Sequence, residues 1–253
     1  MTEPLALITG SGRGIGRAIA EKLSREKIVV VLCARSLEEV ILAADHINKL
    51  GGKAFAFKCD ISRSQDVETL RAQLEEIGTV SILINNAGVA PSAKLEATSD
   101  ELWSETLGVN LSGAFYCSRA FVPGMKSLGK GSIINIASTA AMQGFAYTAA
   151  YTASKHGVLG LTRALAIELK KFRIAVNAVC PGFVRTNIVA ESAARISSQT
   201  GKSAAEAEKV LASMNEEGRL IEPDEIADTV FSLLSTPDFT TGKAFKADGT
   251  LIE

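Results

Sequence analysis

The sequence has 253 residues, of which 47% are hydrophobic and 22% are charged, and its formal net charge is −1. This composition is too apolar for a disordered chain, and the balanced charge gives no attraction toward nucleic acid or anionic membranes. The longest strongly apolar runs, such as residues 28–34, are far shorter than the roughly 20 residues that a membrane span needs.

The start of the chain and its cysteines both favour a cytoplasmic protein. Glu3 and Pro4 lead directly into an apolar run, without the basic start of a signal peptide. The four cysteines are far apart in the sequence and form no Cys-x-x-Cys pair; they are Cys33, Cys59, Cys117 and Cys180. We therefore expect small buried thiols in a reducing compartment and no metal site.

Short apolar runs alternate with amphipathic stretches along the chain. The runs lack polar alternation, as expected for strands that are covered on both faces. The predicted strands are residues 5–9, 28–34, 54–59, 82–85, 132–137, 174–179 and, less regularly, 243–247. Helices are expected between them. Three residue pairs have the spacing of a capping box at a helix start, namely Ser36 with Glu39, Thr98 with Glu101, and Ser203 with Glu206.

The alternation of strand and helix predicts a parallel sheet with helices on both faces. A doubly wound open sheet and an eight-stranded barrel share this rhythm, but about seven strands and the glycines after the first strand favour the open sheet. We expect one Rossmann-type α/β domain over residues 1–253. The segment at about 185–219 has no strand pattern and is rich in Ala, Ser, Glu and Lys, which predicts a helical lid.

A glycine-rich loop follows the first predicted strand and precedes a helix. Its residues are Gly10, Ser11, Gly12, Arg13, Gly14, Ile15 and Gly16. Glycines permit a tight turn and let backbone N–H groups approach a pyrophosphate, and the helix N-terminus adds positive potential. We therefore expect the loop to bind a dinucleotide. Its spacing, T-G-x-x-x-G-x-G, resembles that of the classical short-chain dehydrogenase/reductase family.

The end of the second predicted strand bears on the choice between NAD and NADP. NAD sites usually place a carboxylate about 20 residues beyond the glycine loop, but here Ala34 is followed by Arg35. A carboxylate would repel the 2′-phosphate of NADP, whereas a guanidinium can form two hydrogen bonds with it. Arg13 in the glycine loop can approach the same phosphate. The sequence therefore favours NADP over NAD.

The third and fourth predicted strands end in further residues that we expect to contact the cofactor. Asp60, followed by Ile61, can accept a hydrogen bond from the adenine amino group, although a helix cap before residues 62–70 is an alternative for this carboxylate. The fourth strand ends in the family's N-N-A-G motif, which contributes Asn86, Ala87 and Gly88. The resemblance implies that this segment stabilises the sheet and lines the cofactor.

The fifth predicted strand and the helix after it supply the candidate acid–base chemistry. Ser138 follows the strand, and Tyr151 and Lys155 have the i, i+4 spacing that places them on one helical face. The pKa of a tyrosine is ordinarily about 10, so its use as a proton donor and acceptor near neutrality requires about 4 kcal/mol of phenolate stabilisation. A neighbouring lysine and an oxidised nicotinamide can supply it, while Ser138 can hydrogen-bond the substrate oxygen.

The family resemblance extends over nearly the whole chain and adds two groups of residues. It implies a catalytic tetrad of Asn110, Ser138, Tyr151 and Lys155, in which Asn110 binds a water that connects the lysine to solvent. The motif P-G-x-x-x-T after the sixth strand implies contacts to the nicotinamide, and its residues are Pro181, Gly182, Val184 and Thr186.

The resemblance implies an NADP-dependent enzyme that interconverts a ketone and a secondary alcohol of a small-molecule substrate. The nearest likeness is to reductases of 3-oxoacyl thioesters, but residues 145–150 depart from the G-Q-A-N segment of carrier-protein reductases, and Ala247–Thr250 replaces the usual D-G-G. The alternatives are an NAD-dependent alcohol or hydroxyacyl dehydrogenase and a nucleotide-sensing regulator without catalysis.

Two further expectations concern the substrate and the assembly. We expect a mainly apolar substrate pocket without an arginine cluster for a free carboxylate, formed by the lid with Ala140, Met142, Gln143, Tyr147 and Phe183. The resemblance also implies a homotetramer, in keeping with apolar residues on more than one face of the helices around 102–121 and 152–170.

Overall fold

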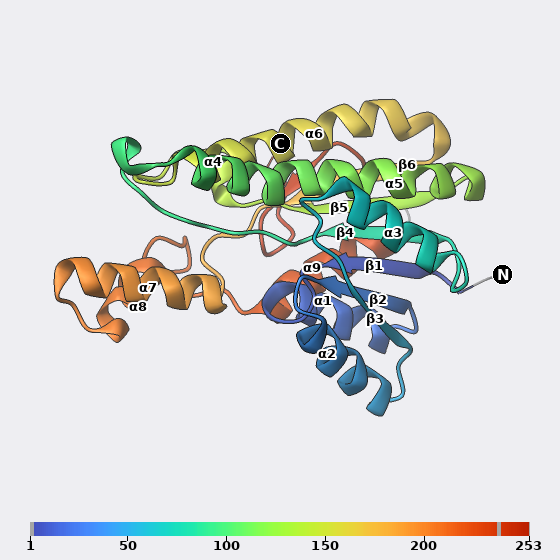
Figure 1. Ribbon diagram of the computed structural model, residues 1–253, viewed down its shortest axis with the longest axis horizontal. Helices are drawn as coiled ribbons and strands as arrows, with labels where there is room; N and C mark the ends of the chain where they lie inside the picture. Colours follow the sequence, from blue (N-terminus) through green and yellow to red (C-terminus); the bar gives the residue numbers. More distant parts are fainter. Residues whose placement is uncertain (1–2, 237–238, 253) are drawn as a thin grey trace.

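The structure is a computed structural model that describes residues 3–236 and 239–252. One parallel sheet forms its centre, with strands in the order β3-β2-β1-β4-β5-β6-β7 (Figure 1). The strands are β1 (Leu5–Thr9), β2 (Val29–Ala34), β3 (Ala54–Lys58), β4 (Val80–Asn85), β5 (Gly131–Ile136), β6 (Ile174–Val179) and β7 (Ala244–Phe245). The prediction of a doubly wound open sheet is therefore confirmed, and every strand overlaps its predicted range.

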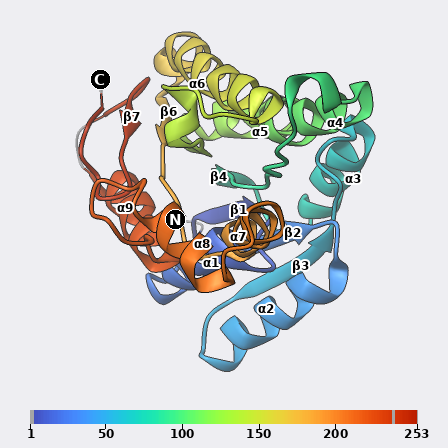
Figure 2. The same cartoon turned by 90° about the vertical axis from the view of Figure 1, so that its left-hand side faces the viewer.

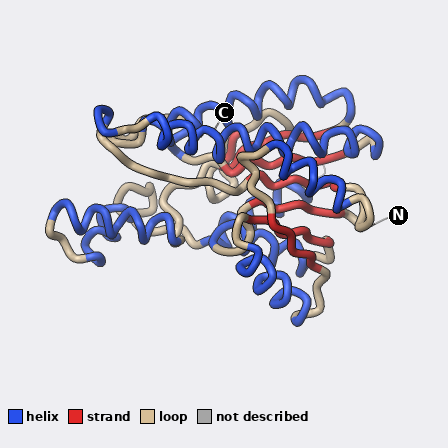
Figure 3. Tube along the Cα trace, in the orientation of Figure 1, coloured by secondary structure: helices blue, strands red, loops and turns tan. Residues whose placement is uncertain are grey.

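Helices cover both faces of the sheet because the strands are apolar on both faces. In β1, Ile8 belongs to a core shared with α1 (Gly14–Arg25), α2 (Leu37–Lys49) and α9 (Pro223–Ser235). Its neighbour Leu7 points the opposite way, since side chains alternate along a strand, and belongs to a second core. That core is formed with α3 (Ser64–Leu74), α5 (Gly113–Leu128) and α6 (Ala149–Leu169). Figure 3 shows these two helical layers on either side of the strands.

The strand order creates a crevice at the carboxyl ends of the strands. From β1 the chain passes outward to β2 and β3 and then crosses back to β4, which pairs with the other side of β1. The loops that follow β1 and β4 therefore diverge, and such a switch point is where ligands bind in open α/β sheets.

Two helices project beyond this end of the sheet (Figures 1 and 2). They are α7 (Asn187–Thr200) and α8 (Ala204–Ala212), and they share a small core that includes Val189 and Leu211. Ser203 and Glu206 form the predicted capping box at the start of α8. The segment is helical, as expected for residues 185–219, and its function as a lid remains a prediction.

One predicted helix start is wrong by one residue. The helix α4 (Asp100–Leu107) is capped by Ser99, whose hydroxyl accepts a hydrogen bond from the N–H of Leu102 at 3.2 Å. Thr98 instead donates to the carbonyl of Lys94, because it ends a short 3₁₀ turn, Leu95–Ala97. The Ser36 hydroxyl caps α2 by accepting from the N–H of Glu39, which is one half of the predicted capping box, while the Glu39 carboxylate lies 3.5 Å from Arg13.

Short helical turns complete the chain: a π-helical turn (Gly108–Ser112) and 3₁₀ turns at Thr139–Ala141 and Lys170–Phe172. The four cysteines are buried and unpaired. Within residues 3–236 and 239–252, no helix combines the length and the apolar character that crossing a membrane requires.

Candidate active site

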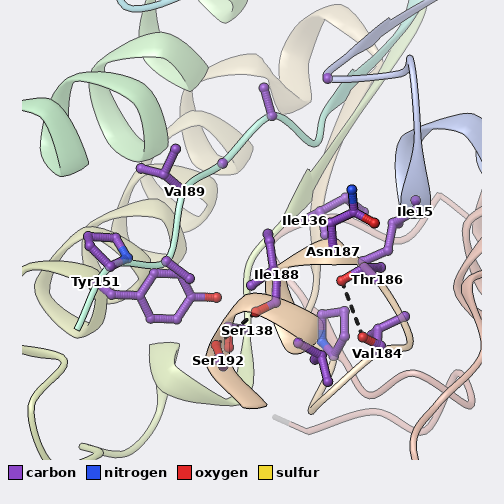
Figure 4. Close-up of a pocket in the computed structure, with 18 of the residues that line it drawn as sticks. Ile15, Val89, Ile136, Ser138, Tyr151, Val184, Thr186, Asn187, Ile188 and Ser192 are labelled. Carbon is purple, nitrogen blue, oxygen red and sulfur yellow. Dashed lines mark hydrogen bonds between the residues drawn. The ribbon is translucent and has the colours of Figure 1, made fainter. Parts of the chain in front are cut away.

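A cavity of about 670 Å³ opens at the carboxyl ends of the strands. Its walls come from the loops after β1 to β6 and from the helices α6, α7 and α8. Figure 4 shows part of this lining. Most of the residues that were predicted to bind cofactor or substrate line this cavity. It therefore joins the expected nucleotide site and the expected acid–base residues in one continuous space.

The glycine loop is built for close contact with a ligand. Gly10 and Gly14 adopt φ values of +64° and +55°, in the left-handed region that favours glycine. A Cβ on Gly10 would lie 2.7 Å from the Cα of Ala87. The first turn of α1 follows, and Arg13 at its N-cap makes no side-chain capping bond. The free N–H groups of that turn fit a pyrophosphate.

Two residues of the predicted glycine loop lie outside the cavity wall. Ser11 is fully buried, donates to the carbonyl of Ile8 at 2.8 Å and accepts from the N–H of Cys33 at 3.1 Å. Gly16 packs against the Asn86 side chain. Their positions indicate that they join the loop to its neighbours, whereas Gly10, Gly12, Arg13, Gly14 and Ile15 face the cavity.

The N-N-A-G segment holds the glycine loop in place. The amide of Asn86 donates to the carbonyls of Thr9 and Gly10 at 2.9 and 3.1 Å. In return, the Thr9 hydroxyl accepts hydrogen bonds from the backbone N–H groups of Asn86 and Ala87. Asn86, Ala87 and Gly88 also line the cavity.

The two arginines expected near a 2′-phosphate both line the cavity and are exposed. Among the described residues, their guanidinium groups have only long contacts to carboxylates, at 3.5 Å for Arg13 to Glu39 and 3.7 Å for Arg35 to Glu105. Exposed pairs of this kind contribute little to stability. Both groups can therefore turn toward an anion at little cost.

Asp60 and Ile61 line the cavity after β3. The Asp60 carboxylate accepts hydrogen bonds from the N–H and hydroxyl groups of Ser62 at 3.1 and 2.7 Å. The helix α3 begins later, at Ser64, with Arg63 as its N-cap. Asp60 thus stabilises the turn before the helix and is not its cap.

Tyr151 and Ser138 meet at the wall of the cavity, and the phenol points toward Ser138 in Figure 4. Burial raises the pKa of the Tyr151 phenol, and a hydrogen bond with Ser138 only partly opposes this effect. The expected phenolate stabilisation by Lys155 is not present in this structure. The reason is that Lys155 Nζ donates to the carbonyl of Ile136 at 2.8 Å and lies 5.8 Å from the centre of the Tyr151 ring.

Lys155 is itself buried, and burial lowers its pKa to about 8. A Cβ on Gly88 would lie 3.7 Å from Lys155 Nζ and 3.2 Å from Asn110 Oδ1. A side chain at position 88 would therefore press on both the lysine and the asparagine.

Asn110 does not line the cavity. It lies in the π-helical turn between α4 and α5 and is almost fully buried. Its amide pairs with both backbone groups of Val89, accepting at 2.8 Å and donating at 2.9 Å, and it also donates to the hydroxyl of Ser154 at 2.9 Å. Asn110 thus ties the segment after β4 to the helix that carries Tyr151 and Lys155.

The loop after β6 reaches the cavity opposite the glycine loop. Pro181, Gly182, Val184 and Thr186 all line it. The Thr186 hydroxyl donates to the carbonyl of Val184 at 3.2 Å, and the Thr186 methyl would lie 3.2 Å from a Cβ on Gly14. The loop expected to hold the nicotinamide therefore lies next to the loop expected to hold the pyrophosphate.

Sequence reasoning missed Asn215 and Arg195. The Asn215 amide accepts from the N–H of Phe183 and donates to the carbonyls of Phe183 and Arg219, so it fixes the loop after β6 to the end of the projecting segment. Arg195 lines the cavity from α7. No local motif marks either residue.

The substrate end of the cavity also differs in part from expectation. Ala140, Tyr147 and Phe183 line it as expected, whereas Met142 and Gln143 are not among its lining residues. Both follow the 3₁₀ turn Thr139–Ala141, which carries the chain past the cavity wall.

The chain is similar to known proteins over almost its full length. The family model described as "short chain dehydrogenase" matches residues 4–197. The short-chain reductase protein NovJ of Streptomyces niveus is 37% identical over 249 residues, which cover 98% of this chain and 93% of the relative. The cyclohexanol dehydrogenase of Acinetobacter sp. is 36% identical over 248 residues, which cover 97% and 93%.

A solved structure supports the same grouping. A variant of actinorhodin polyketide ketoreductase, determined by crystallography with NADPH, superimposes with a TM-score of 0.93 at 35% sequence identity. The superposition covers 98% of this chain and 97% of that chain.

Proposed function

The chain belongs to the short-chain dehydrogenase/reductase family, and on this premise we propose that it reduces a ketone to a secondary alcohol with NADPH, using Tyr151 as the proton donor. The observation that carries the proposal is the meeting of Tyr151 and Ser138 at a cavity that also reaches the glycine loop. The relatives support the interconversion of ketones and alcohols with a nicotinamide cofactor. The residue roles and the choice of NADPH are our own proposal.

Each member of the candidate tetrad has a distinct role in the proposal. Ser138 donates a hydrogen bond to the substrate carbonyl, and Tyr151 gives its phenolic proton to the same oxygen as charge develops there. Lys155, once its Nζ leaves the carbonyl of Ile136, supplies positive charge near the phenol and a donor for the ribose of the cofactor. Asn110 positions the backbone of Val89 and the helix of Tyr151.

The cofactor supplies hydride when it is bound, and the residues along the cavity fit its parts. The N–H groups at the start of α1 would hold the pyrophosphate, and Asp60 with Ile61 would flank the adenine. Asn86, Ala87 and Gly88 would line the cofactor, and Pro181, Gly182, Val184 and Thr186 would hold the nicotinamide. Arg13 and Arg35 would contact a 2′-phosphate, which is the basis for preferring NADP to NAD.

For the substrate we propose a ketone with an apolar body, with 3-oxoacyl thioesters as the first class to test. The lid end of the cavity is lined by apolar side chains, among them Phe145, Phe183, Ile188 and Ile196. The relation to a polyketide ketoreductase supports the same class. In this proposal α7 and α8 act as the lid.

A panel of ketones tests this function. NADPH oxidation would be followed with 3-oxoacyl thioesters, cyclic ketones and small linear ketones, and the alcohol products identified by chiral chromatography. Turnover of at least one class is expected. A protein that binds NADPH but reduces none of them would favour the nucleotide-sensing alternative, which the presence of both Tyr151 and Lys155 at the cavity argues against.

We also propose that the protein works as a homotetramer in the cytoplasm. The helices α4, α5 and α6 expose large apolar side chains, including Trp103 (41% exposed), Phe115 (40%) and Ile167 (82%). Subunit contacts that bury these side chains would remove their apolar surface from water. The four unpaired cysteines are suited to a reducing compartment.

A further inference from the structure

We propose that Arg195 binds an anionic oxygen group of the substrate, a carboxylate or a phosphate, at the lid end of the cavity. The inference rests on the proposed function in one respect, because it takes the cavity beside Tyr151 as the substrate site. It adds a substrate class: ketones that carry a negative charge at the far end of an apolar body.

Arg195 faces the same space as the candidate acid–base residues. Ile188, Ser192 and Arg195 follow one another at spacings of four and three residues in α7, so they share one helical face. Figure 4 shows Ile188 and Ser192 next to Ser138 and Tyr151. All five residues line the cavity.

Among the side chains and backbone groups that the structure describes, only Nη2 of the Arg195 guanidinium has hydrogen-bond acceptors. Its Nη2 donates to the carbonyl of Ala90 at 3.3 Å and to the hydroxyl of Ser192 at 3.0 Å, and both acceptors are neutral. A guanidinium has five N–H donors in a planar fork that matches a carboxylate or phosphate. The bond to Ala90, next to the Val89 that Asn110 holds, fixes the guanidinium at the cavity wall.

Within the described part of the chain, Arg195 also differs from the other half-buried arginines because no carboxylate pairs with it. Arg17 and Arg71 are half-buried as well, and they pair with Glu21 at 2.8 Å and Glu75 at 2.7 Å. No carboxylate of residues 3–236 or 239–252 lies within 4.0 Å of the Arg195 guanidinium. A partly desolvated charge without a partner is unfavourable, and an anionic ligand would supply the partner.

The surroundings of Arg195 separate it from the other charges of the cavity. Ile196 lies beside it in the chain, and Val210, Leu211 and Met214 line the same end. The acidic residues in the wall, Glu39 and Asp60, come from the β2 and β3 end. A substrate with its ketone at Tyr151 would thus extend along apolar side chains and end at a cation.

The test compares matched substrates in the parent and in Arg195→Gln. The first set contains linear methyl ketones of increasing chain length that end in a carboxylate, each paired with its methyl ester. The second set pairs the acetoacetyl thioester of phosphopantetheine with that of pantetheine, which lacks only the phosphate. In at least one set we expect kcat/KM for the anionic member to fall at least about tenfold in Arg195→Gln, as for the loss of a charge-assisted hydrogen bond. The neutral member should change less than about threefold, and the responding set identifies the anion.

Two matched variants accompany this comparison. Arg195→Lys should recover part of the preference for the anionic member, because the charge remains but the fork is lost. Lys202→Gln removes one positive charge from the exposed turn between α7 and α8 and should leave the preference unchanged. Equal losses for charged and neutral substrates in Arg195→Gln would overturn the proposal, since they would indicate a structural bond to Ala90. No preference in the parent for either anionic member would overturn it as well.

Binding separates this inference from the proposed function. If the parent reduces none of these ketones, the proposed function fails. Calorimetric titration then tests whether Arg195 binds an anion. The probe is the oxo acid with the longest chain, titrated into the parent and Arg195→Gln with NADP present. At least about tenfold weaker binding to the variant supports the anion site, and equal binding overturns it.

Discussion

At the scale of single residues, Arg35 is the strongest determinant of cofactor choice in this account. Replacing Arg35 with Asp removes a charge-assisted contact of about 1.5–3 kcal/mol and places a negative charge beside the 2′-phosphate. The new carboxylate can accept hydrogen bonds from the free ribose hydroxyls of NADH. We therefore expect the ratio of kcat/KM for NADPH to that for NADH to fall by more than about tenfold and to reverse.

The measurement needs a fixed salt concentration, because salt screens the interaction. Arg13→Ala alone should weaken NADPH less, and combined with Arg35→Asp it should complete the change of preference. A parent that already prefers NADH, or a ratio that Arg35→Asp leaves unchanged, would contradict the role given to the end of β2. The acid–base assignment would be unaffected.

The ionisation of Tyr151 and Lys155 predicts a pH profile for the reaction. Burial raises the pKa of Tyr151, so the phenol stays protonated through neutral pH and can act as an acid. Burial also lowers the pKa of Lys155 to about 8, so its positive charge is lost as the pH rises through that value. Loss of either proton as the pH rises lowers the rate of ketone reduction. We expect kcat/KM for ketone reduction to be flat below about pH 8 and to fall above it.

The profile should be recorded at constant ionic strength for the parent and for Lys155→Ala. In the variant, the fall that begins near pH 8 should disappear along with most of the activity. Reduction that accelerates above this pH would show that neither group acts as described.

Local motifs explain which site residues could be predicted. The sequence predicts the glycine loop, Ser138 and the Tyr151–Lys155 pair as site residues, because each follows a strand or occupies one helical turn. Arg195 and Asn215 could not be predicted, since their contacts to Ala90 and Phe183 span 105 and 32 residues. The ionisation of Tyr151 was not predictable either, because it depends on where Lys155 Nζ makes its hydrogen bond.

At the scale of elements, the start of α9 makes a specific stability prediction. Glu225 accepts two hydrogen bonds from Arg219 at 2.7 Å and one from the N–H of Glu222 at 2.7 Å. The Arg219 guanidinium and this cap lower the pKa of Glu225 to about 2. Because the pair is about half exposed, solvent weakens it. We expect Glu225→Gln to reduce the free energy of unfolding by only about 1 kcal/mol at neutral pH.

The pH dependence of this loss has a definite sign. A carboxyl group whose pKa is lowered in the folded protein stabilises it above its ordinary pKa, and the effect is lost as the pH falls toward the lowered value. The difference in unfolding free energy between parent and variant should therefore be largest near pH 7 and shrink toward pH 3, as measured by urea unfolding. Glu76→Gln, an exposed carboxylate change in the loop after α3, serves as the control. A difference that grows on acidification would contradict the assignment.

The elements themselves were largely predictable, and the exceptions have local causes. The buried strands are continuous apolar runs, so periodicity identifies them. The start of α4 was misplaced because Thr98 and Ser99 are both capping residues, and the preceding 3₁₀ turn decides between them. The periodicity of apolar residues does not predict the π-helical turn that carries Asn110, because this turn depends on packing between α4, α5 and α6.

At the scale of the whole molecule, the exposed side of α4, α5 and α6 predicts assembly. If this side forms subunit interfaces, sedimentation at micromolar concentration should give a tetramer. Ile167→Glu, on the exposed face of α6, should weaken the association by placing charges in the interface. A monomeric parent would contradict the proposal without affecting the site.

The sequence predicts the architecture of the whole molecule more completely than it predicts the residues that line the cavity. Strand and helix alternate so regularly that a doubly wound sheet follows, and the position of the glycine loop fixes the cofactor end. The substrate end depends on how α7 and α8 pack over the sheet, which no pattern within residues 185–219 specifies. Met142 and Gln143 do not line the wall as expected, because the 3₁₀ turn Thr139–Ala141 carries the chain past it.

The most direct test of the central claim is NADPH oxidation by Tyr151→Phe in a single turnover. This change removes only the phenolic hydroxyl, and the ring and the cofactor site remain. Tyr116→Phe, which removes a phenolic hydroxyl from α5 at a residue that is not among the cavity's lining residues, is the matched control. We expect the rate of ketone reduction to fall by at least about a thousandfold in Tyr151→Phe, with NADPH binding unchanged and the control within about threefold of the parent. A Tyr151→Phe rate within tenfold of the parent would contradict the claim that Tyr151 is the proton donor.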